Sequence, residues 1–181
     1  MIRVAINGFG RIGRLCFRET FGSDDFEVVA INDLTDPAQL AYLLKYDTSH
    51  RTYRVNEISY EGEYLIVGNR KIRVFAEMDP ANLPWKELEI DEVFECTGKF
   101  TDKEKAMAHI KAGARKVIIS APAKGDLKTI VYNVNENILD GTEEVISAAS
   151  CTTNCLAPVL NIINDEFGII KGNMTTIHAY T

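Results

Sequence analysis

The chain has 181 residues, of which 46% are hydrophobic and 25% charged, and its formal net charge is −6 at pH 7. This length accommodates one full domain and part of a second. The negative charge argues against nucleic acid or an anionic membrane as a partner, and no apolar run approaches the roughly 18 residues of a membrane helix.

A strand pattern begins at once with residues 2–6, which leaves no room for a signal peptide. Between the strands, apolar residues at helical spacing predict helices over 11–21, from Asp36-Pro37 onward, and over 102–112. This alternation indicates an α/β protein built on a doubly wound parallel sheet of the Rossmann type, with ligands bound beyond the carboxyl ends of its strands. The further predicted strands are 28–31, 92–95, 116–120, 129–133 and 144–147.

Two local features modify this pattern. Residues 53–76 form short alternating segments around Glu61-Gly62 and Gly68-Asn69, which predicts an antiparallel excursion inserted into the parallel sheet. Thr101 and Glu104 have the spacing of a capping box, which predicts the start of the helix that ends at Gly113.

Three glycines, Gly8, Gly10 and Gly13, form a G-x-G-x-x-G sequence directly after the first strand. They would respectively make a tight turn, let the backbone approach a pyrophosphate, and let the helix pack close to the sheet. An ordinary strand–helix turn would use the same glycines, and Asp33 alone would suit a turn or a helix cap. In register with the glycines, however, the Asp33 carboxylate can accept both ribose hydroxyls of NAD and would repel the 2′-phosphate of NADP. Together they predict NAD.

A cysteine follows the last predicted strand. Ser150 is a good N-cap and would put Cys151 at the first helical position, where a helix N-terminus stabilises a thiolate. The hydroxyls of Thr152 and Thr153 would make a polar entrance to the site that suits phosphate. Pro158 conflicts with a regular helix, so either the helix is kinked there or it begins later and Cys151 lies on a turn.

The other cysteines have simpler interpretations. Cys16 and Cys96 are interpreted as small buried hydrophobic residues. Cys155 is either a redox partner of Cys151 or, preferably, a structural residue, because the spacing of the two on a helix does not suit a disulfide. The four cysteines form no CxxC pair and have no metal-ligand spacing with the three histidines. We therefore expect a reduced cytoplasmic protein without a metal site.

Three histidines are candidate bases for Cys151. His50 lies in a polar turn, and His109 lies off the apolar stripe of its predicted helix, so both are expected to be exposed to solvent. His178 lies in a β-rich run from which its side chain can point outward. A histidine in such a run is more often a hydrogen-bonded sheet residue than a catalyst.

Taken in order, these motifs resemble the phosphorylating glyceraldehyde-3-phosphate dehydrogenase family, and the resemblance covers the whole chain. It implies that Cys151 is the nucleophile and His178 the base in the glycolytic, NAD-dependent oxidation of glyceraldehyde 3-phosphate. Inorganic phosphate would then convert a cysteine thioester into 1,3-bisphosphoglycerate. The resemblance also implies a homotetramer for the full-length protein. The matching segments are 7–14, 31–33, 46–48, 150–155 and 178–181.

The same resemblance implies a set of binding residues. Where the family often has arginine this chain has Met78, and where it usually has serine and aspartate this chain has Ala123 and Gly125, so we expect altered adenine contacts and unaltered chemistry. The implied cofactor residues are Gly8, Gly10, Arg11, Ile12, Gly13, Asp33, Met78, Thr97, Gly98, Phe100 and Ser120, and the implied phosphate-binding residues are Ser150, Thr152 and Thr181.

The chains of this family are longer, and this one stops inside the histidine motif. We therefore expect an NAD-binding domain over 1–150 and the start of an α+β catalytic domain over 151–181, with 169–181 as the first strand of its sheet. Two alternatives remain open: an erythrose-4-phosphate dehydrogenase, and a non-catalytic NAD-binding module. A cysteine hydrolase would explain neither the glycines nor Asp33.

Overall fold

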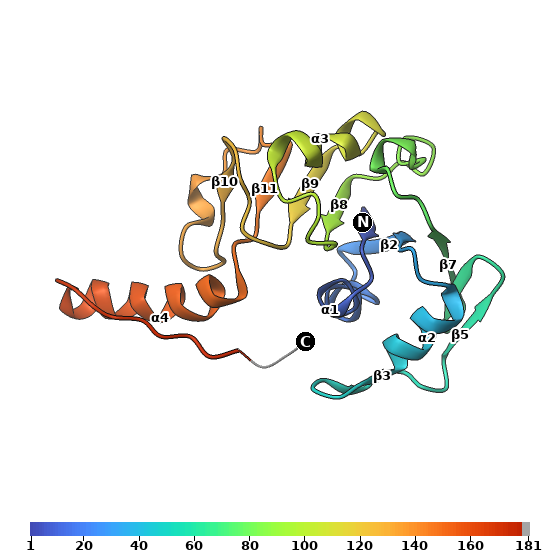
Figure 1. Cartoon of the computed structure of the whole chain (residues 1–181), viewed down its shortest axis with the longest axis horizontal. Coiled ribbons are helices and arrows are strands. Elements are labelled where there is room, and N and C mark those ends of the chain that lie inside the picture. The colour runs from blue at the N-terminus through green and yellow to red at the C-terminus, as the bar shows by residue number, and fades with distance from the viewer. Residues whose placement is uncertain (179–181) are drawn as a thin grey trace.

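The structure is a computed structural model that describes residues 1–178. Within these residues a nine-stranded sheet has the order β10-β11-β9-β8-β1-β2-β7-β6-β5 (Figure 1). Its strands are β1 (Ile2–Asn7), β2 (Phe26–Asn32), β5 (Ile58–Glu61), β6 (Tyr64–Val67), β7 (Arg70–Phe75), β8 (Glu92–Glu95), β9 (Lys116–Ile119), β10 (Lys128–Thr129) and β11 (Val145–Ser147).

The sheet is parallel from β10 to β7, and β7, β6 and β5 pair antiparallel at its far edge. From the central β1 the chain builds outward through β2 on one side, then returns to β8 on the other. The strand order thus reverses between β1 and β8, which is where ligands bind in doubly wound sheets. The predicted Rossmann-type fold and the antiparallel excursion are both confirmed.

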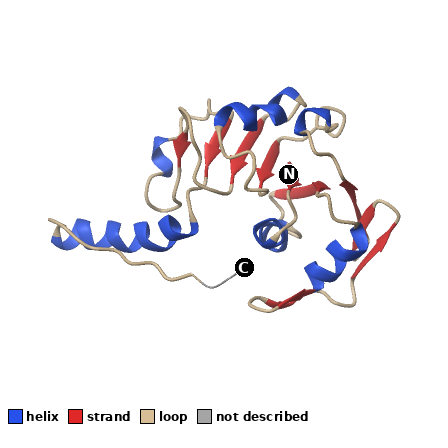
Figure 2. Cartoon of the chain, viewed as in Figure 1, coloured by secondary structure: helices blue, strands red, loops and turns tan. Residues whose placement is uncertain are grey.

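Four α-helices, two short 3₁₀ helices (Pro80–Asn82 and Glu136–Ile138) and a small hairpin complete the described chain, with helices drawn in blue and strands in red in Figure 2. Helix α2 begins as predicted, because Asp36 accepts a hydrogen bond from the Gln39 amide and Pro37 occupies the first turn. The helices are α1 (Arg11–Thr20), α2 (Pro37–Lys45), α3 (Lys103–Lys111) and α4 (Cys151–Phe167), and the hairpin pairs β3 (Tyr46–Asp47) with β4 (Arg51–Thr52).

Residues of β1 alternate between two cores because successive side chains of a strand point to opposite faces. Val4 and Ile6 belong to the core beneath α1 and α2, whereas Ala5 belongs to a core that includes Trp85 and faces α3. Helix α3 accordingly lies on the other side of the sheet from α1 (Figure 1). Both faces of the central strands are therefore covered, which explains their continuous apolar runs.

Two predicted boundaries are wrong. The capping box at Thr101 does not form: the N-cap is Asp102, whose carboxylate accepts a hydrogen bond from the Lys105 amide at 2.9 Å. A carboxylate one position later performs the same capping, so the threonine is not needed. The strand expected at 129–133 reduces to β10, because Val131 instead begins a turn around the Asn135 side chain.

Helix α4 leaves the sheet and extends beyond it (Figure 1). The predicted strand at 169–181 is not found in the part that the structure describes, where residues 169–178 have no regular structure. A strand needs hydrogen-bonding partners on a neighbouring strand, and none accompanies these residues within the described range. Among residues 1–178, no helix has both the length and the apolarity to cross a bilayer.

Candidate functional site

A cavity of about 350 Å³ lies at the carboxyl ends of β1, β2 and β8, where the strand order reverses. The fold places it where the glycine motif predicts a dinucleotide. Six of the predicted cofactor residues line it: Gly8, Gly10, Asp33, Met78, Thr97 and Phe100.

The three glycines have distinct environments. Gly8 has a φ of +88°, and a Cβ on it would lie 2.7 Å from the Thr97 amide nitrogen. A Cβ on Gly13 would lie 2.0 Å from the Gly8 carbonyl oxygen, so α1 can approach the turn only because this residue has no side chain. A Cβ on Gly10 would meet no protein atom within 4 Å. The space over Gly10 is therefore open to a ligand, as a pyrophosphate-binding turn requires.

The N-terminus of α1 faces this space. Its N-cap, Gly10, has no side-chain cap, so the amides of Arg11, Ile12 and Gly13 in the first turn lack helical partners. Unpaired amides at a helix N-terminus form a natural anion site. Ile12 is exposed, and the Arg11 guanidinium lies 3.4 Å from an Asp47 carboxylate oxygen, which directs it away from the turn.

Asp33 connects the end of β2 to the glycine turn. Its Oδ2 accepts a hydrogen bond from the Phe9 amide at 2.7 Å, and its Oδ1 accepts one from the Thr35 amide at 2.9 Å. Each carboxylate oxygen keeps further acceptor capacity, which suits the two hydroxyls of a ribose. The 2′-phosphate of NADP at this position would meet the negative charge of the Asp33 carboxylate. The donor and acceptor set of the cavity therefore fits NAD.

The other five predicted cofactor residues do not line the cavity: Arg11, Ile12 and Gly13 in the first turn of α1, and Gly98 and Ser120. Gly98 lies in the adjoining loop with a φ of +70°. Ser120 follows β9, and its amide donates to the Glu95 carbonyl at 3.0 Å. Cys96, expected in the core, is half-buried and lines the cavity. A hydrogen bond with Cys16 and burial together hold the pKa of Cys96 far above its usual range, so it remains a thiol.

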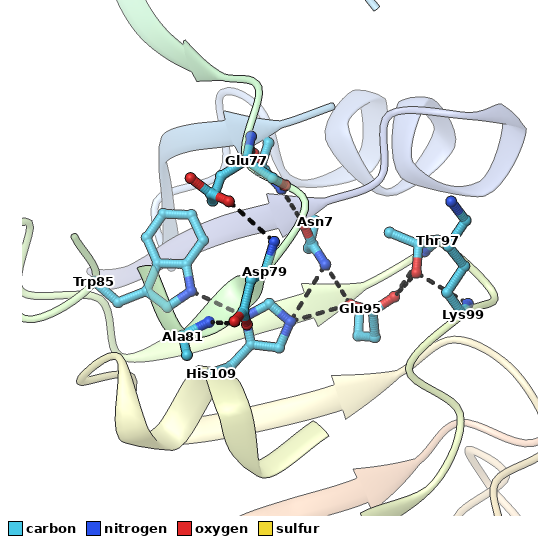
Figure 3. A network of polar contacts seen from close by, with 10 residues as sticks. Asn7, Glu77, Asp79, Ala81, Trp85, Glu95, Thr97, Lys99 and His109 are labelled. Carbon is cyan, nitrogen blue, oxygen red and sulfur yellow. Dashed lines mark hydrogen bonds and ion pairs between the residues drawn. The ribbon is translucent and has the colours of Figure 1, made fainter. Parts of the chain in front are cut away.

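The expectation that His109 is exposed is wrong. Its side chain is fully buried, its Nδ1 accepts a hydrogen bond from Trp85 Nε1 at 3.0 Å, and its Nε2 lies 3.1 Å from Glu95 Oε2 (Figure 3). Although His109 lies off the apolar stripe of α3, the fold packs it against the end of β8, where Glu95 supplies a polar partner. His50, by contrast, is exposed as expected.

Sequence reasoning also missed three buried polar residues around this histidine. Glu95 ends β8, while Asn7 and Asn32 end β1 and β2, and Asn32 donates to Asn7 Oδ1 at 2.7 Å. Polar residues at the ends of otherwise apolar strands were the available signal, since buried polar groups need partners.

A second groove, of about 320 Å³, holds both predicted catalytic residues. Cys151 is exposed at the first position of α4, and His178 approaches it from the segment that follows the helix. The His178 Nε2 also lies 2.8 Å from the Thr176 hydroxyl oxygen. Thr152 lines the groove, and Thr181 lies outside the described residues.

The start of α4 is capped as predicted. The Ser150 hydroxyl oxygen accepts from the Thr153 amide at 2.9 Å, and the helix is continuous from Cys151 with Pro158 inside it. The alternative in which the helix begins later is therefore wrong. The Asn154 side chain supports this turn by donating to the carbonyls of Ala148 and Ser150.

Comparison with known proteins agrees with this geometry. Residues 2–103 match the family model described as "Glyceraldehyde 3-phosphate dehydrogenase, NAD binding domain", and residues 150–181 match the corresponding C-terminal domain. The first match identifies NAD as the cofactor of the domain.

Three bacterial relatives are named glyceraldehyde-3-phosphate dehydrogenase. Those of Clostridium pasteurianum and Clostridium acetobutylicum are 62% and 60% identical over all 181 residues, and each is covered to 54% of its length. That of Mycoplasma pneumoniae is 54% identical over 99% of this chain and 53% of its own length. The chain thus spans about half the length of the curated relatives it matches. Because residues 2–103, more than half of the chain, match the NAD-binding domain model, the chain belongs to the glyceraldehyde 3-phosphate dehydrogenase family.

Proposed function

We propose that the protein containing this chain converts D-glyceraldehyde 3-phosphate and inorganic phosphate into 1,3-bisphosphoglycerate, using NAD and a thioester on Cys151. One observation carries the proposal most directly. An exposed cysteine begins a long helix, shares a groove with a histidine, and follows in the chain a domain with a dinucleotide-type cavity. Cys155 is also exposed and lines the same groove, so what distinguishes Cys151 is its position at the capped N-terminus of α4.

Cys151 acts as the nucleophile. Its thiolate attacks the aldehyde carbon, and His178 accepts the thiol proton. The new carbon–sulfur bond yields a thiohemiacetal whose oxygen is stabilised by the Cys151 amide and the imidazolium of His178. NAD, when bound, supplies the oxidising power by accepting a hydride.

Oxidation leaves an acyl group on the Cys151 sulfur. A phosphate oxygen then attacks the thioester carbon, and the thiolate leaves as the carbon–sulfur bond breaks. A thiolate suits both steps because it is a strong nucleophile and a good leaving group. Ser150, Thr152 and Thr181 hold the phosphate groups in this proposal, with residues 1–150 as the cofactor domain and 151 onward as the start of the catalytic domain.

Cofactor binding is assigned to the groups around the glycine turn. The amides of Arg11 and Ile12 bind the pyrophosphate, and Asp33 binds the adenosine ribose. Met78 lies near the adenine, whereas Thr97, Gly98, Phe100 and Ser120 line the nicotinamide half. The same proposal includes a homotetrameric, cytoplasmic enzyme of glycolysis.

Steady-state kinetics of the full-length protein test the proposal. NADH formation from glyceraldehyde 3-phosphate should require inorganic phosphate and should disappear with Cys151→Ser. Faster phosphate-independent turnover of erythrose 4-phosphate would favour the alternative dehydrogenase, and NAD binding without any turnover would favour a non-catalytic module. Either result would refute the proposed activity.

A further inference from the structure

A buried carboxylate lies directly behind the cofactor cavity. Glu95 is only 1% exposed and does not line the cavity itself. Its Oε1 accepts hydrogen bonds from both the amide and the hydroxyl of Thr97, and its Oε2 accepts one from Asn7 Nδ2 at 2.5 Å (Figure 3). The fourth neighbour, His109 Nε2, lies 3.1 Å from the same Oε2.

The network determines where the His109 proton lies. The indole N–H of Trp85 can only donate, and it lies 3.0 Å from His109 Nδ1. Nδ1 is therefore unprotonated, the ring is neutral, and its one proton is on Nε2, where it is donated to Glu95. The pair is consequently a hydrogen bond and not an ion pair. Asn7 Nδ2 lies 3.3 Å from the same Nε2, and because both atoms carry protons this contact is not a hydrogen bond; both atoms donate to Glu95 Oε2. Glu95 is held in the interior by four neutral donors, which is how a buried carboxylate can be tolerated without a cation.

The carboxylate determines the shape of the loop that follows it. The Thr97 hydroxyl donates to Glu95 and accepts from the Lys99 amide at 3.0 Å, so it joins the buried charge to the loop backbone. Gly98 between them has a φ of +70°, which closes the turn. The ring of Phe100 packs edge-on against that of His109, with centroids 6.3 Å apart. Thr97, Lys99 and Phe100 all line the cavity.

We propose that Glu95 is a positioning residue for the cofactor: through Thr97 it holds residues 97–100 in the conformation that receives NAD. This inference rests on the NAD binding proposed above. Four donors converge on Glu95, so both of its oxygens must accept. A glutamine at this position offers only one acceptor oxygen. Its NH₂ group would face other donors, either those of Thr97 or those of Asn7 and His109. Charge and shape together are therefore required.

The test measures NAD dissociation constants by calorimetry on the full-length protein, with thermal unfolding recorded in parallel. Glu95→Gln should weaken NAD about tenfold, the equivalent of one charge-assisted hydrogen bond. Thr97→Val, which removes only the hydroxyl, should weaken it about equally, and Thr97→Ser should restore it. If Glu95→Gln does not fold, Glu95→Asp, which keeps the charge and withdraws it by one methylene, replaces it.

A double-mutant cycle separates positioning from independent contacts. Because both substitutions remove the same hydrogen bond, the double variant should bind NAD about tenfold more weakly than wild type, whereas independent effects would multiply to about a hundredfold. Val117→Ala is the matched control: it removes buried apolar contacts on β9, outside the polar network, and should lower the melting temperature without altering NAD affinity.

Multiplying effects in the cycle, or a folded Glu95 or Thr97→Val variant with wild-type affinity, would overturn the inference. So would a loss of NAD affinity in Val117→Ala as large as that in the Glu95 variant, since general destabilisation would then explain both. Absence of NAD binding in the wild-type protein would instead refute the proposed function, so the two failures are distinguishable.

Discussion

Replacing Gly13 by alanine tests the packing that forms the cofactor turn. The added Cβ would lie 2.0 Å from the Gly8 carbonyl oxygen, and real Cβ contacts essentially never fall below 3.0 Å, so α1 and the turn must separate by about 1 Å. Neither neighbour can yield easily. Gly8 is itself pressed against the Thr97 backbone, and Ile6, 3.2 Å from the new atom, is fully buried.

Two effects oppose each other in this variant. Alanine is favoured over glycine in a helix by about 1 kcal/mol, whereas overpacking of a rigid site costs about 3 kcal/mol. We therefore expect a net destabilisation of about 2 kcal/mol, which corresponds to a fall in Tm of roughly 4–8 °C for a domain of this size. Because the turn that approaches the pyrophosphate moves with Gly8, NAD affinity should fall by at least about tenfold.

Gly10→Ala is the matched control. Its backbone has a φ of −70°, and the new Cβ would meet no protein atom within 4 Å, so the free energy of unfolding should change by less than about 1 kcal/mol. NAD binding should still be lost, because the methyl group enters the space left for the ligand. Thermal unfolding by circular dichroism and calorimetric NAD titration measure both quantities. A Gly13→Ala protein with unchanged Tm and unchanged NAD affinity would refute the reasoning.

Three further predictions concern charge and reactivity. The wild-type protein should bind NAD at least about tenfold more tightly than NADP, a difference in binding free energy of about 1.4 kcal/mol. Asp33→Ala should reduce this difference mainly by weakening the binding of NAD. Equal affinities of the wild-type protein for the two cofactors, measured by calorimetry, would show that Asp33 does not select between them. Iodoacetamide at neutral pH should label Cys151 before Cys96, because Cys151 is exposed at a helix N-terminus whereas Cys96 is a half-buried thiol with a raised pKa. Labelling in the reverse order, measured by mass spectrometry, would contradict the role of Cys151 as the nucleophile. Hydrogen bonding to Lys128 lowers the pKa of Glu143 to about 2, so this stabilisation is present above the ordinary carboxyl pKa of ~4.3 and is lost as the pH falls toward 2. Lys128→Met should therefore flatten the decline in melting temperature over that acid range, and an unchanged decline would show that the pair contributes nothing.

Local sequence determined the cofactor site well. Gly13 meets the turn that precedes its own helix, and Asp33, at the end of the next strand, bonds the Phe9 amide of that turn. Gly8 is the exception, because the backbone that it must avoid belongs to Thr97. Ser150 capping Cys151 is equally local, since the cap bonds an amide three residues away. Such features are predictable because the partners are neighbours in the chain or lie at a spacing that the motif itself specifies.

The sequence was ambiguous where two local rules conflicted or were equally satisfied. Pro158 argued against a helix that starts at Cys151, yet the cap and the apolar face prevail and the helix runs through the proline. Thr101 and Asp102 are both competent caps, and only the backbone conformation selects the second. The run at 169–178 has strand composition, but strand formation depends on a partner, which composition does not supply.

Tertiary structure alone decided the environment of His109. The helical pattern places it off the apolar stripe, which ordinarily means solvent, whereas the fold buries it between Trp85, 24 residues earlier, and Glu95, 14 residues earlier. No spacing rule links these three residues, because their contact arises from the docking of α3 against the end of β8. The sequence by itself therefore predicted the glycine turn and the helix that Ser150 caps at Cys151. Packing of α3 against the sheet decided that His109 meets Trp85 and Glu95, since a buried donor or acceptor bonds with whichever partner the fold brings to it.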